Sequence, residues 1–525
     1  MKVRYLTMLL LMTASLLFAT NPDNNENTAA KTKLFTLEKG AIIDYTETTV
    51  SFIGGKQNLF LVYSVNDEAN GTYYSYVVVN DKKYGPYDYV SAMNFSKTTG
   101  NFHFAYYTKD AYYMNVNGTV TGPFTGFPEI MQINEYKNYA VFSYEADGWY
   151  IWHGGKKYGP SEDFDLPVLS ANGTMSYSYG NGGKRYANVN GKIYGPYDYL
   201  YNLSVTDNGA GFFFMYGNGT ESYYNYNGKS FGPYATVGAG GVNTERGGYF
   251  ATYTDKNGKG YIDLNGKING PYISEPYCYY LMKGFVYATV EKETGKFYIL
   301  TEKGETGPYA SVVFGTGAES GTGYAVAVAK TDGKLAVVHN GKELPGIDNL
   351  QAVTCNYDGS EVLYFGSGAD SKFYVYVNGT KYGPFEEMYG GDMMRDKNNK
   401  GWYIHYLEGG KQYAVINGNK VGPFGNAEVW NIKFSSGGGY MLPYTSDDYT
   451  QGFVMVNGKT FPLPGAYSIY TEISGSNWAI VSVADTYQLT LNGKNMGANT
   501  FAPSLTEKGG HYLSIEGDTL YLNTF

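Results

Sequence analysis

Acidic side chains recur in the connections that follow a repeated Gly-Pro pair, and their type and spacing suit them to chemistry. They are Asp88, Glu129, Glu162, Asp163, Asp165, Asp198, Glu275, Asp348, Glu386, Glu387 and Glu428. Carboxylates that a fold brings together bind cationic ligands or calcium, and a facing pair about 5 to 10 Å apart hydrolyses glycosidic bonds. No Asp-x-Asp-x-Asp-Gly run supports calcium further, and solvated loop acids are the simplest interpretation.

Other residues that carry chemistry are few. Each of the five histidines, His103, His153, His339, His405 and His511, falls in a different repeat, and none has a recognisable catalytic context. The sequence has no G-x-S-x-G, no H-E-x-x-H and no metal-ligand spacing. The two cysteines, Cys278 and Cys355, could form one disulfide, although two buried thiols are the simpler interpretation. We therefore assign no catalytic residue, no metal ligand and no cofactor.

Tyrosine is the second candidate for binding, with 58 copies in 525 residues. Several form adjacent pairs, namely Tyr73-Tyr74, Tyr106-Tyr107, Tyr112-Tyr113, Tyr223-Tyr224 and Tyr279-Tyr280. Because neighbouring residues of a strand face opposite ways, at most one of each pair belongs to the core. The other offers a large contact area and a hydroxyl to a peptide or glycan, unless it packs between repeats, which is the simpler interpretation.

The elements that must position these side chains are copies of one repeat. Gly-Pro pairs begin at Gly85, Gly122, Gly159, Gly195, Gly232, Gly270, Gly307, Gly383 and Gly422, in steps of 36 to 39 residues with one step of 76. Pro345-Gly346 marks a degenerate copy inside the long step, and two weaker copies end at Tyr467 and Phe501. Twelve copies therefore cover residues 80 to 500.

Each copy predicts four short antiparallel strands. In residues 91–124, three alternating or apolar runs are separated by turns, and Asn117-Gly118 then begins a hairpin into "TVTGPF". Four such strands in about 37 residues, repeated, indicate a β-propeller blade. Proline cannot donate to a sheet ladder, so we place Gly-Pro on the fourth, edge strand. The aromatic residue that follows it in eight of the nine copies is expected to pack between blades.

The first turn of several repeats carries a family resemblance. "LSANGTMSYSY", "VTDNGAGFFFM" and "CNYDGSEVLYF", together with the later "V-V-x-N-G-K-x-x-G-P-Y-D" pattern, resemble the WD-repeat-like propeller repeats of the TolB type. The resemblance spans nearly the whole chain after residue 33 and implies the propeller fold. Such repeats are common in secreted bacterial proteins, so it also implies a periplasmic or extracellular location.

The two ends of the chain together supply the strands of one blade. The last residues supply three strands of a blade, whereas Thr32 to Tyr45 look like a solitary fourth strand, so the termini are expected to share a thirteenth blade. One ring normally holds 4–8 blades, and thirteen therefore predict two propellers of seven and six. We place their boundary near residue 270, at 34–270 and 271–525, and leave tandem and nested arrangements open.

The N-terminus predicts export. Lys2 and Arg4 precede an apolar run to Phe18, which is typical of a signal peptide over residues 1–19, and residues 20–33 read as a polar linker. A retained membrane anchor is the alternative, and no later segment is apolar enough to span a bilayer. The net charge of −9 and the lack of a basic tract argue against nucleic acid as a partner.

These observations favour an exported, non-catalytic platform that binds protein, peptide or glycan. The alternative is a secreted carbohydrate-active enzyme whose carboxylates lie at the mouth of the propeller channel. A purely structural surface-layer protein is the third class, and a structure without any binding pocket would support it.

Overall fold

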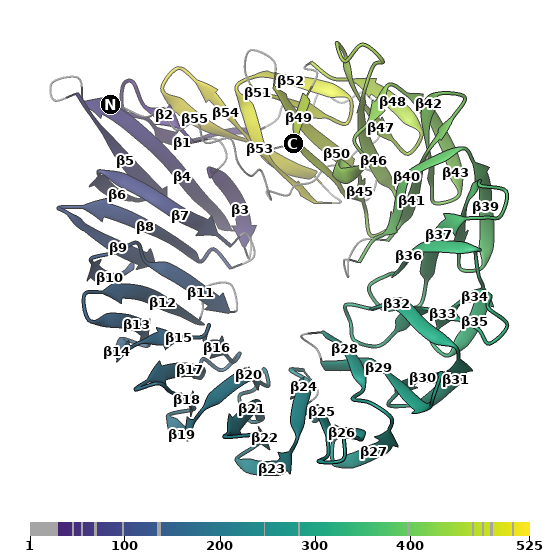
Figure 1. Ribbon diagram of the computed structural model, residues 1–525. Coiled ribbons are helices and arrows are strands. Elements are labelled where there is room, and N and C mark those ends of the chain that lie inside the picture. The colour runs from purple at the N-terminus through teal and green to yellow at the C-terminus, as the bar shows by residue number, and fades with distance from the viewer. Residues whose placement is uncertain are drawn as a thin grey trace, which may run out of the picture. The chain divides into compact units, whose positions relative to one another are not determined.

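The computed structural model describes residues 30–44, 47–53, 56–67, 71–96, 99–133, 138–245, 247–281, 284–395, 400–464, 467–474, 477–483, 487–506 and 509–524. Within these ranges the protein is all-β, and its one helical element is the 3-10 turn η1 (Val429–Asn431). The strands form thirteen four-stranded sheets (Figure 1). In three sheets the first strand is split in two, as in β2 (Ile42–Ile43) and β3 (Thr49–Ile53). The predicted blade and the count of thirteen are confirmed.

One blade shows how the repeat folds. β20 (Tyr199–Val205), β21 (Phe212–Asn218), β22 (Glu221–Tyr226) and β23 (Lys229–Tyr234) pair in that order, each antiparallel to the last. β21 has buried residues on both faces, which explains its continuous apolar run. Between β22 and β23, Asn227 and Gly228 have φ values of 50° and 84°. Positive φ at both central positions is what a type I′ hairpin requires, so the Asn-Gly prediction is confirmed.

Every Gly-Pro pair lies in the fourth strand, at the edge of its sheet. Proline has no N–H to donate, and at this edge no inter-strand hydrogen bond is lost as a result. The aromatic residue after it packs on the next blade. Tyr197, which ends β19 (Lys192–Tyr197), lies 4.1 Å from Tyr216 between ring centroids, and Tyr234 lies 3.9 Å from Tyr253. In the exceptional copy, the Ser161 hydroxyl donates to a backbone carbonyl of the next blade at 2.7 Å. The predicted packing between blades is confirmed.

The Asn-Gly turns also join blades. The Asn417 side chain accepts a hydrogen bond from the Trp402 N–H of its own blade at 2.9 Å and donates to the Gly438 carbonyl of the next blade at 2.8 Å. Asn340 does the same, with its donor bond to Gly359 at 2.6 Å. One residue type therefore closes the hairpin and connects it to the first turn of its neighbour.

The termini share a blade. β1 (Ala30–Thr36) pairs antiparallel with β55 (Thr519–Thr524) and completes the sheet begun by β53 (Thr500–Thr506) and β54 (Gly509–Glu516), beside which it is drawn in Figure 1. Leu37, Leu513 and Leu520 are buried in one cluster that also contains residues of the next blade. The predicted closure is confirmed, and β1 begins at residue 30, inside the stretch expected to be a linker.

Contacts divide the chain into two compact units. One contains the residues up to Lys109 together with those from Asn398 onward, and the other contains Asp110–Lys397. The separation into propellers of seven and six blades, with a boundary near residue 270, stays a prediction. The predicted signal peptide and residues 20–29 of the predicted linker lie outside the described residues.

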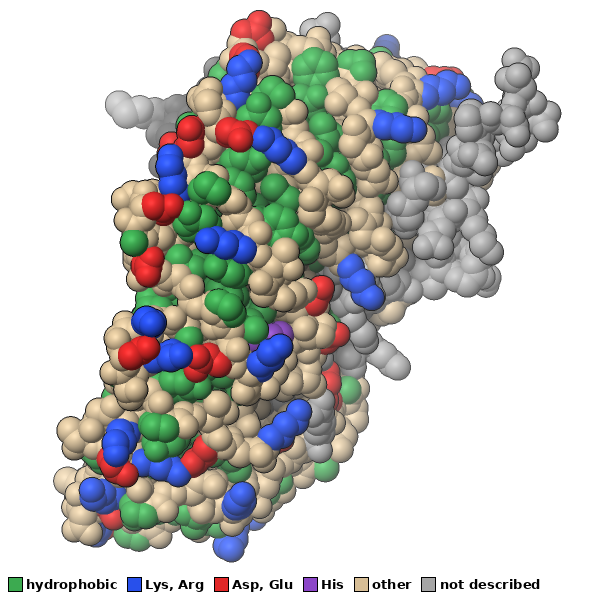
Figure 2. Space-filling view, turned by 90° about the vertical axis from the view of Figure 1, so that its right-hand side faces the viewer, with side chains coloured by type: hydrophobic (Ala, Val, Ile, Leu, Met, Phe, Trp, Pro, Cys, Tyr) green, Lys and Arg blue, Asp and Glu red, His purple; other side chains and the backbone are tan. Residues whose placement is uncertain are grey.

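The surface mixes charges of both signs. Figure 2 shows Lys or Arg and Asp or Glu side chains close together on one face, with hydrophobic side chains between them. Ion pairs such as Lys330–Glu343, at 2.8 Å, and lysines above aromatic rings, such as Lys381 at 3.7 Å from the Tyr374 centroid, are typical of the repeats. In the part of the chain that the structure describes, no helix has the length and apolar character needed to cross a membrane.

Candidate binding surface

Nine of the eleven predicted acids lie in the connections from a fourth strand to the first strand of the next blade or at the beginning of that strand, whereas Asp165 and Glu428 lie between the two halves of a split first strand. Most are exposed, whereas Glu275 and Glu428 are half-buried. Within the described ranges, no group of three or more His, Cys, Asp or Glu side chains is arranged to hold a metal ion. Calcium at these loops therefore stays a prediction.

Several of these acids bind groups of the chain itself. Asp163 and Asp165 both pair with Arg185. Asp198 pairs with Lys184 at 2.5 Å and accepts the N–H of Gly219 at 2.5 Å. These bonds hold the pKa of the Asp198 carboxyl below its ordinary value. These carboxylates therefore tie the connection between blades to the nearby hairpins.

Glu275 is positioned differently, because it lies against an almost bare strand. β24 (Thr236–Val242) carries Gly238, Ala239 and Gly240 in its middle. A Cβ added at Gly238 would lie 1.7 Å from Glu275 Oε1, so only glycine leaves room for the carboxylate. Its oxygens accept hydrogen bonds from Thr252 Oγ1 at 2.9 Å and Thr236 Oγ1 at 3.1 Å.

Two stacked tyrosines lie in β20, in the blade before that of β24, and one of them, Tyr201, interacts electrostatically with this carboxylate. The Tyr201 hydroxyl donates to the Val237 carbonyl of β24 at 2.7 Å, and the Tyr199 hydroxyl bonds to Ser222 at 2.9 Å. Their rings stack with centroids 5.9 Å apart. Burial raises the pKa of Tyr201, with a smaller contribution from Tyr199 and Glu275, so its hydroxyl is a donor at neutral pH.

The surface that results is aromatic, held by hydrogen bonds and partly open to solvent. Tyr199 and Tyr201 are each 37% exposed, and Tyr277, two residues after Glu275 in β28 (Tyr277–Leu281), is 72% exposed. We call Tyr199, Tyr201 and Glu275, together with Tyr277, which follows Glu275 closely in the chain, the Tyr201–Glu275 surface. It offers ring faces, hydroxyls and one carboxylate, a set that binds by stacking and hydrogen bonding.

Sequence reasoning identified Glu275 but missed its neighbours. The available signal was "TVGAGGV", a first strand with three glycines that leaves room for side chains of adjacent blades. Of the predicted tyrosine pairs, Tyr106 and Tyr224 are buried. Tyr223 is half-buried and stacks on Tyr216 with ring centroids 5.1 Å apart. Tyr73 is 57% exposed. At the pairs that contain Tyr106 and Tyr224, one tyrosine belongs to the core, as expected.

Four of the histidines and both cysteines lie in environments that disfavour their charged forms. Burial lowers the pKa of His103 to about 4 and also lowers the pKa of His339, His405 and His511. Cys278 and Cys355 are buried free thiols, as the simpler interpretation expects, and burial raises the pKa of Cys355 to about 11. Such thiols are poor nucleophiles.

No protein-family model matches the sequence, and no curated protein matches it. Among solved structures, the chain is similar to BBS1N in complex with ARL6DN at 14% identity, with 47% of this chain and 93% of that chain covered and a TM-score of 0.22. It is also similar to the Dos1 propeller (11% identity, 59% and 96% covered, TM-score 0.23) and to the C-terminal WD40 domain of Sif2 (10%, 60% and 92%, 0.24). The assignment to the β-propeller fold rests on the sheet topology above.

Proposed function

We propose that the protein is exported and that the Tyr201–Glu275 surface docks a protein, peptide or glycan without catalysing a reaction. The observation that carries this proposal is the placement of exposed tyrosines on first strands. Tyr199, Tyr201 and Tyr277 keep open ring area although their backbone is fixed in sheets. Aromatic side chains that are already ordered lose little entropy on binding.

Support for export comes from the N-terminal sequence pattern and from the resemblance to TolB-type repeats. The natural compartment is then the periplasm or the cell exterior. Cell fractionation tests this part of the proposal, together with N-terminal sequencing of the mature chain. We expect a chain that begins at Thr20 in the exported fraction, and an unprocessed chain would contradict export.

The binding test uses the chain from residue 20 onward on an array of peptides, glycans and peptidoglycan fragments, with and without calcium. We expect a specific signal that falls at least tenfold in Tyr277→Ala, because Tyr277 is the most exposed ring of the surface. Tyr73→Ala is the matched control, since Tyr73 is also exposed, at 57%, but lies in another blade. An equal loss in both variants would show that the signal does not come from this surface.

A further inference from the structure

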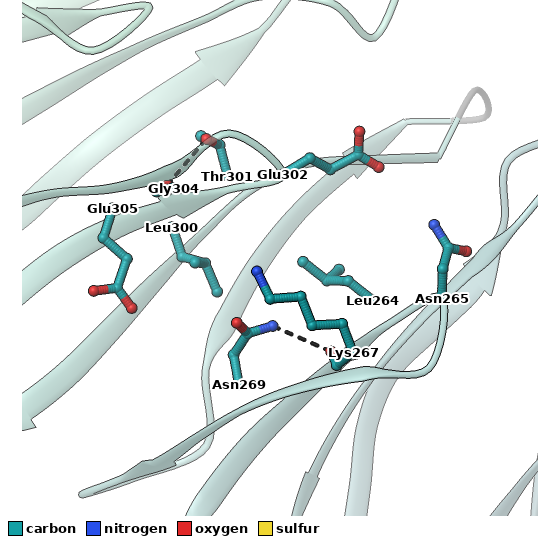
Figure 3. A pocket seen from close by; sticks show the side chains of 9 residues that line it. All are labelled: Leu264, Asn265, Lys267, Asn269, Leu300, Thr301, Glu302, Gly304 and Glu305. Carbon is teal, nitrogen blue, oxygen red and sulfur yellow. Dashed lines mark hydrogen bonds between the residues drawn. The ribbon is translucent and has the colours of Figure 1, made fainter.

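A hollow of about 480 Å³ lies between two neighbouring blades within Asp110–Lys397 (Figure 3). One wall is the turn from β26 (Gly260–Leu264) to β27 (Lys267–Tyr272), and the other is the turn from β30 (Lys296–Thr301) to β31 (Gly304–Tyr309). The volume falls in the range of about 300–1,000 Å³ that small-molecule sites occupy.

The hollow coincides with a change in the residue before Gly-Pro relative to the two preceding blades. In the two preceding blades, the residue before Gly-Pro is aromatic and fills the space toward the next blade. Tyr194 lies 5.5 Å from Phe212 between ring centroids, and Phe231 lies 6.2 Å from Tyr249. Asn269 occupies this position in β27. A carboxamide is much smaller than a phenol ring, so the space between the hairpins is left open.

The same substitution changes what the neighbouring lysine does. Lys192 covers the ring of Tyr194 at 4.8 Å, and Lys229 covers the ring of Phe231 at 4.7 Å. Lys267 has no ring two residues further on, and its side chain lines the hollow instead (Figure 3). No carboxylate in the described part of the chain forms an ion pair with it. Its ammonium is therefore available to a ligand.

The opposite wall also departs from the repeat. Thr301 to Gly304 replace the usual Asn-Gly turn, and the Thr301 hydroxyl donates to the Gly304 carbonyl at 3.1 Å. Glu302 adds an exposed carboxylate, whereas Glu305 is already paired with Lys292. The remaining cation at Lys267 and the anion at Glu302 balance, which favours a ligand without net charge.

We propose that this hollow binds a neutral saccharide of one or two rings. Sugar hydroxyls both donate and accept, which matches the ammonium of Lys267, the carboxamide of Asn269 and the carboxylate of Glu302. Leu264 and Leu300 supply apolar contact for the C–H face of a ring. The site is separate from the Tyr201–Glu275 surface and does not depend on its function.

Saturation-transfer NMR with the chain from residue 20 onward tests the proposal, using maltose, cellobiose and N,N′-diacetylchitobiose as probes. We expect saturation transfer to the ring protons of at least one sugar. Asn269→Tyr restores the aromatic residue of the preceding blades and fills the hollow, so the transfer should disappear. Lys267→Ala should lower it at least fivefold, and Lys229→Ala, at the same position of the preceding blade, should leave it unchanged.

Three results would overturn the proposal: no transfer to any of the three sugars, transfer that persists in Lys267→Ala, or loss in Lys229→Ala equal to that in Lys267→Ala. Circular dichroism of each variant reports folding, and Lys267→Ala decides the matter if Asn269→Tyr does not fold. Transfer lost in Tyr277→Ala but kept in Asn269→Tyr would assign the sugar to the Tyr201–Glu275 surface and also refute the hollow as its site.

Discussion

The ring of Tyr186 lies against Gly195, nine residues later on the neighbouring strand. A Cβ added at Gly195 would be 2.9 Å from Tyr186 Cδ1 and 2.9 Å from the Arg185 carbonyl oxygen, and Gly195 has a φ of 121°. The same contact is found in every Gly-Pro copy, always with a nine-residue separation. The other pairs are Tyr76 with Gly85, Tyr113 with Gly122, Tyr150 with Gly159, Tyr223 with Gly232, Tyr261 with Gly270, Tyr298 with Gly307, Tyr374 with Gly383 and Tyr413 with Gly422.

Replacing this glycine should destabilise the blade beyond the effect of backbone strain. Gly195→Ala adds a close contact to an unfavourable φ, whereas Gly191→Ala, at φ 83°, meets open space. We expect Gly195→Ala to lose about 1–3 kcal/mol more than Gly191→Ala, because overpacking adds to strain. Urea unfolding followed by tyrosine fluorescence measures both variants, and equal losses would contradict a role for the ring contact.

The bond between Asn417 and Gly438 should contribute to the association of two blades. Asn417→Asp keeps the acceptor for the Trp402 N–H but places a carboxylate oxygen against a carbonyl oxygen. We expect a loss of about 1–3 kcal/mol, the usual consequence of breaking a hydrogen bond and leaving one group unpaired. Asn419→Asp, at the exposed first position of the strand after this turn, is the control for added charge and should change the unfolding midpoint little.

Removal of β1 should expose the edge of β55. A chain that begins at Leu37 lacks the partner of the last strand, so the amides of Thr519–Thr524 that bond to β1 should exchange with solvent much faster. Hydrogen exchange read by mass spectrometry measures this, with a chain that begins at Ala30 as the control. Unchanged protection of this peptide would mean that β55 does not need the shared blade.

Acid should destabilise the protein below the ordinary histidine pKa. The pKa of His103 is about 4 in the folded protein and about 6.5 in the unfolded chain, so between these values the unfolded chain binds more protons. The stabilisation is complete above pH 6.5 and is lost as the pH falls toward 4, by up to about 1.4 kcal/mol per pH unit. Urea unfolding at pH 7.5, 6 and 5 should show this slope, and it should be shallower in His103→Gln.

The two thiols should be unreactive until the protein unfolds. Both are buried, and the raised pKa of Cys355 leaves little thiolate at pH 8. We expect no rapid reaction with a disulfide reagent in the native state and two thiols per chain in guanidinium chloride. A single reactive thiol in the native protein would show that one site is open, and no reaction after unfolding would indicate a disulfide.

The sequence by itself determined the blade. A type I′ hairpin requires positive φ at both central residues, which Asn227-Gly228 supplies, the missing N–H of proline favours an edge strand, and the spacing of Gly-Pro sets the repeat length. The shared blade was also expected, because three strands at one end and one at the other would leave open edges if they stayed apart. These features depend on local backbone chemistry, which can be predicted from short sequence patterns.

Only the tertiary structure decided how neighbouring blades meet. Glu275 lies on Gly238 and bonds to threonines of the preceding blade, and Asn269 leaves a hollow because the turn opposite it also departs from the repeat. Each outcome depends on two segments tens of residues apart that pack side by side. A repeat pattern gives the position of every side chain within its own blade, whereas the side chains of the next blade determine whether that position is filled, bridged or open.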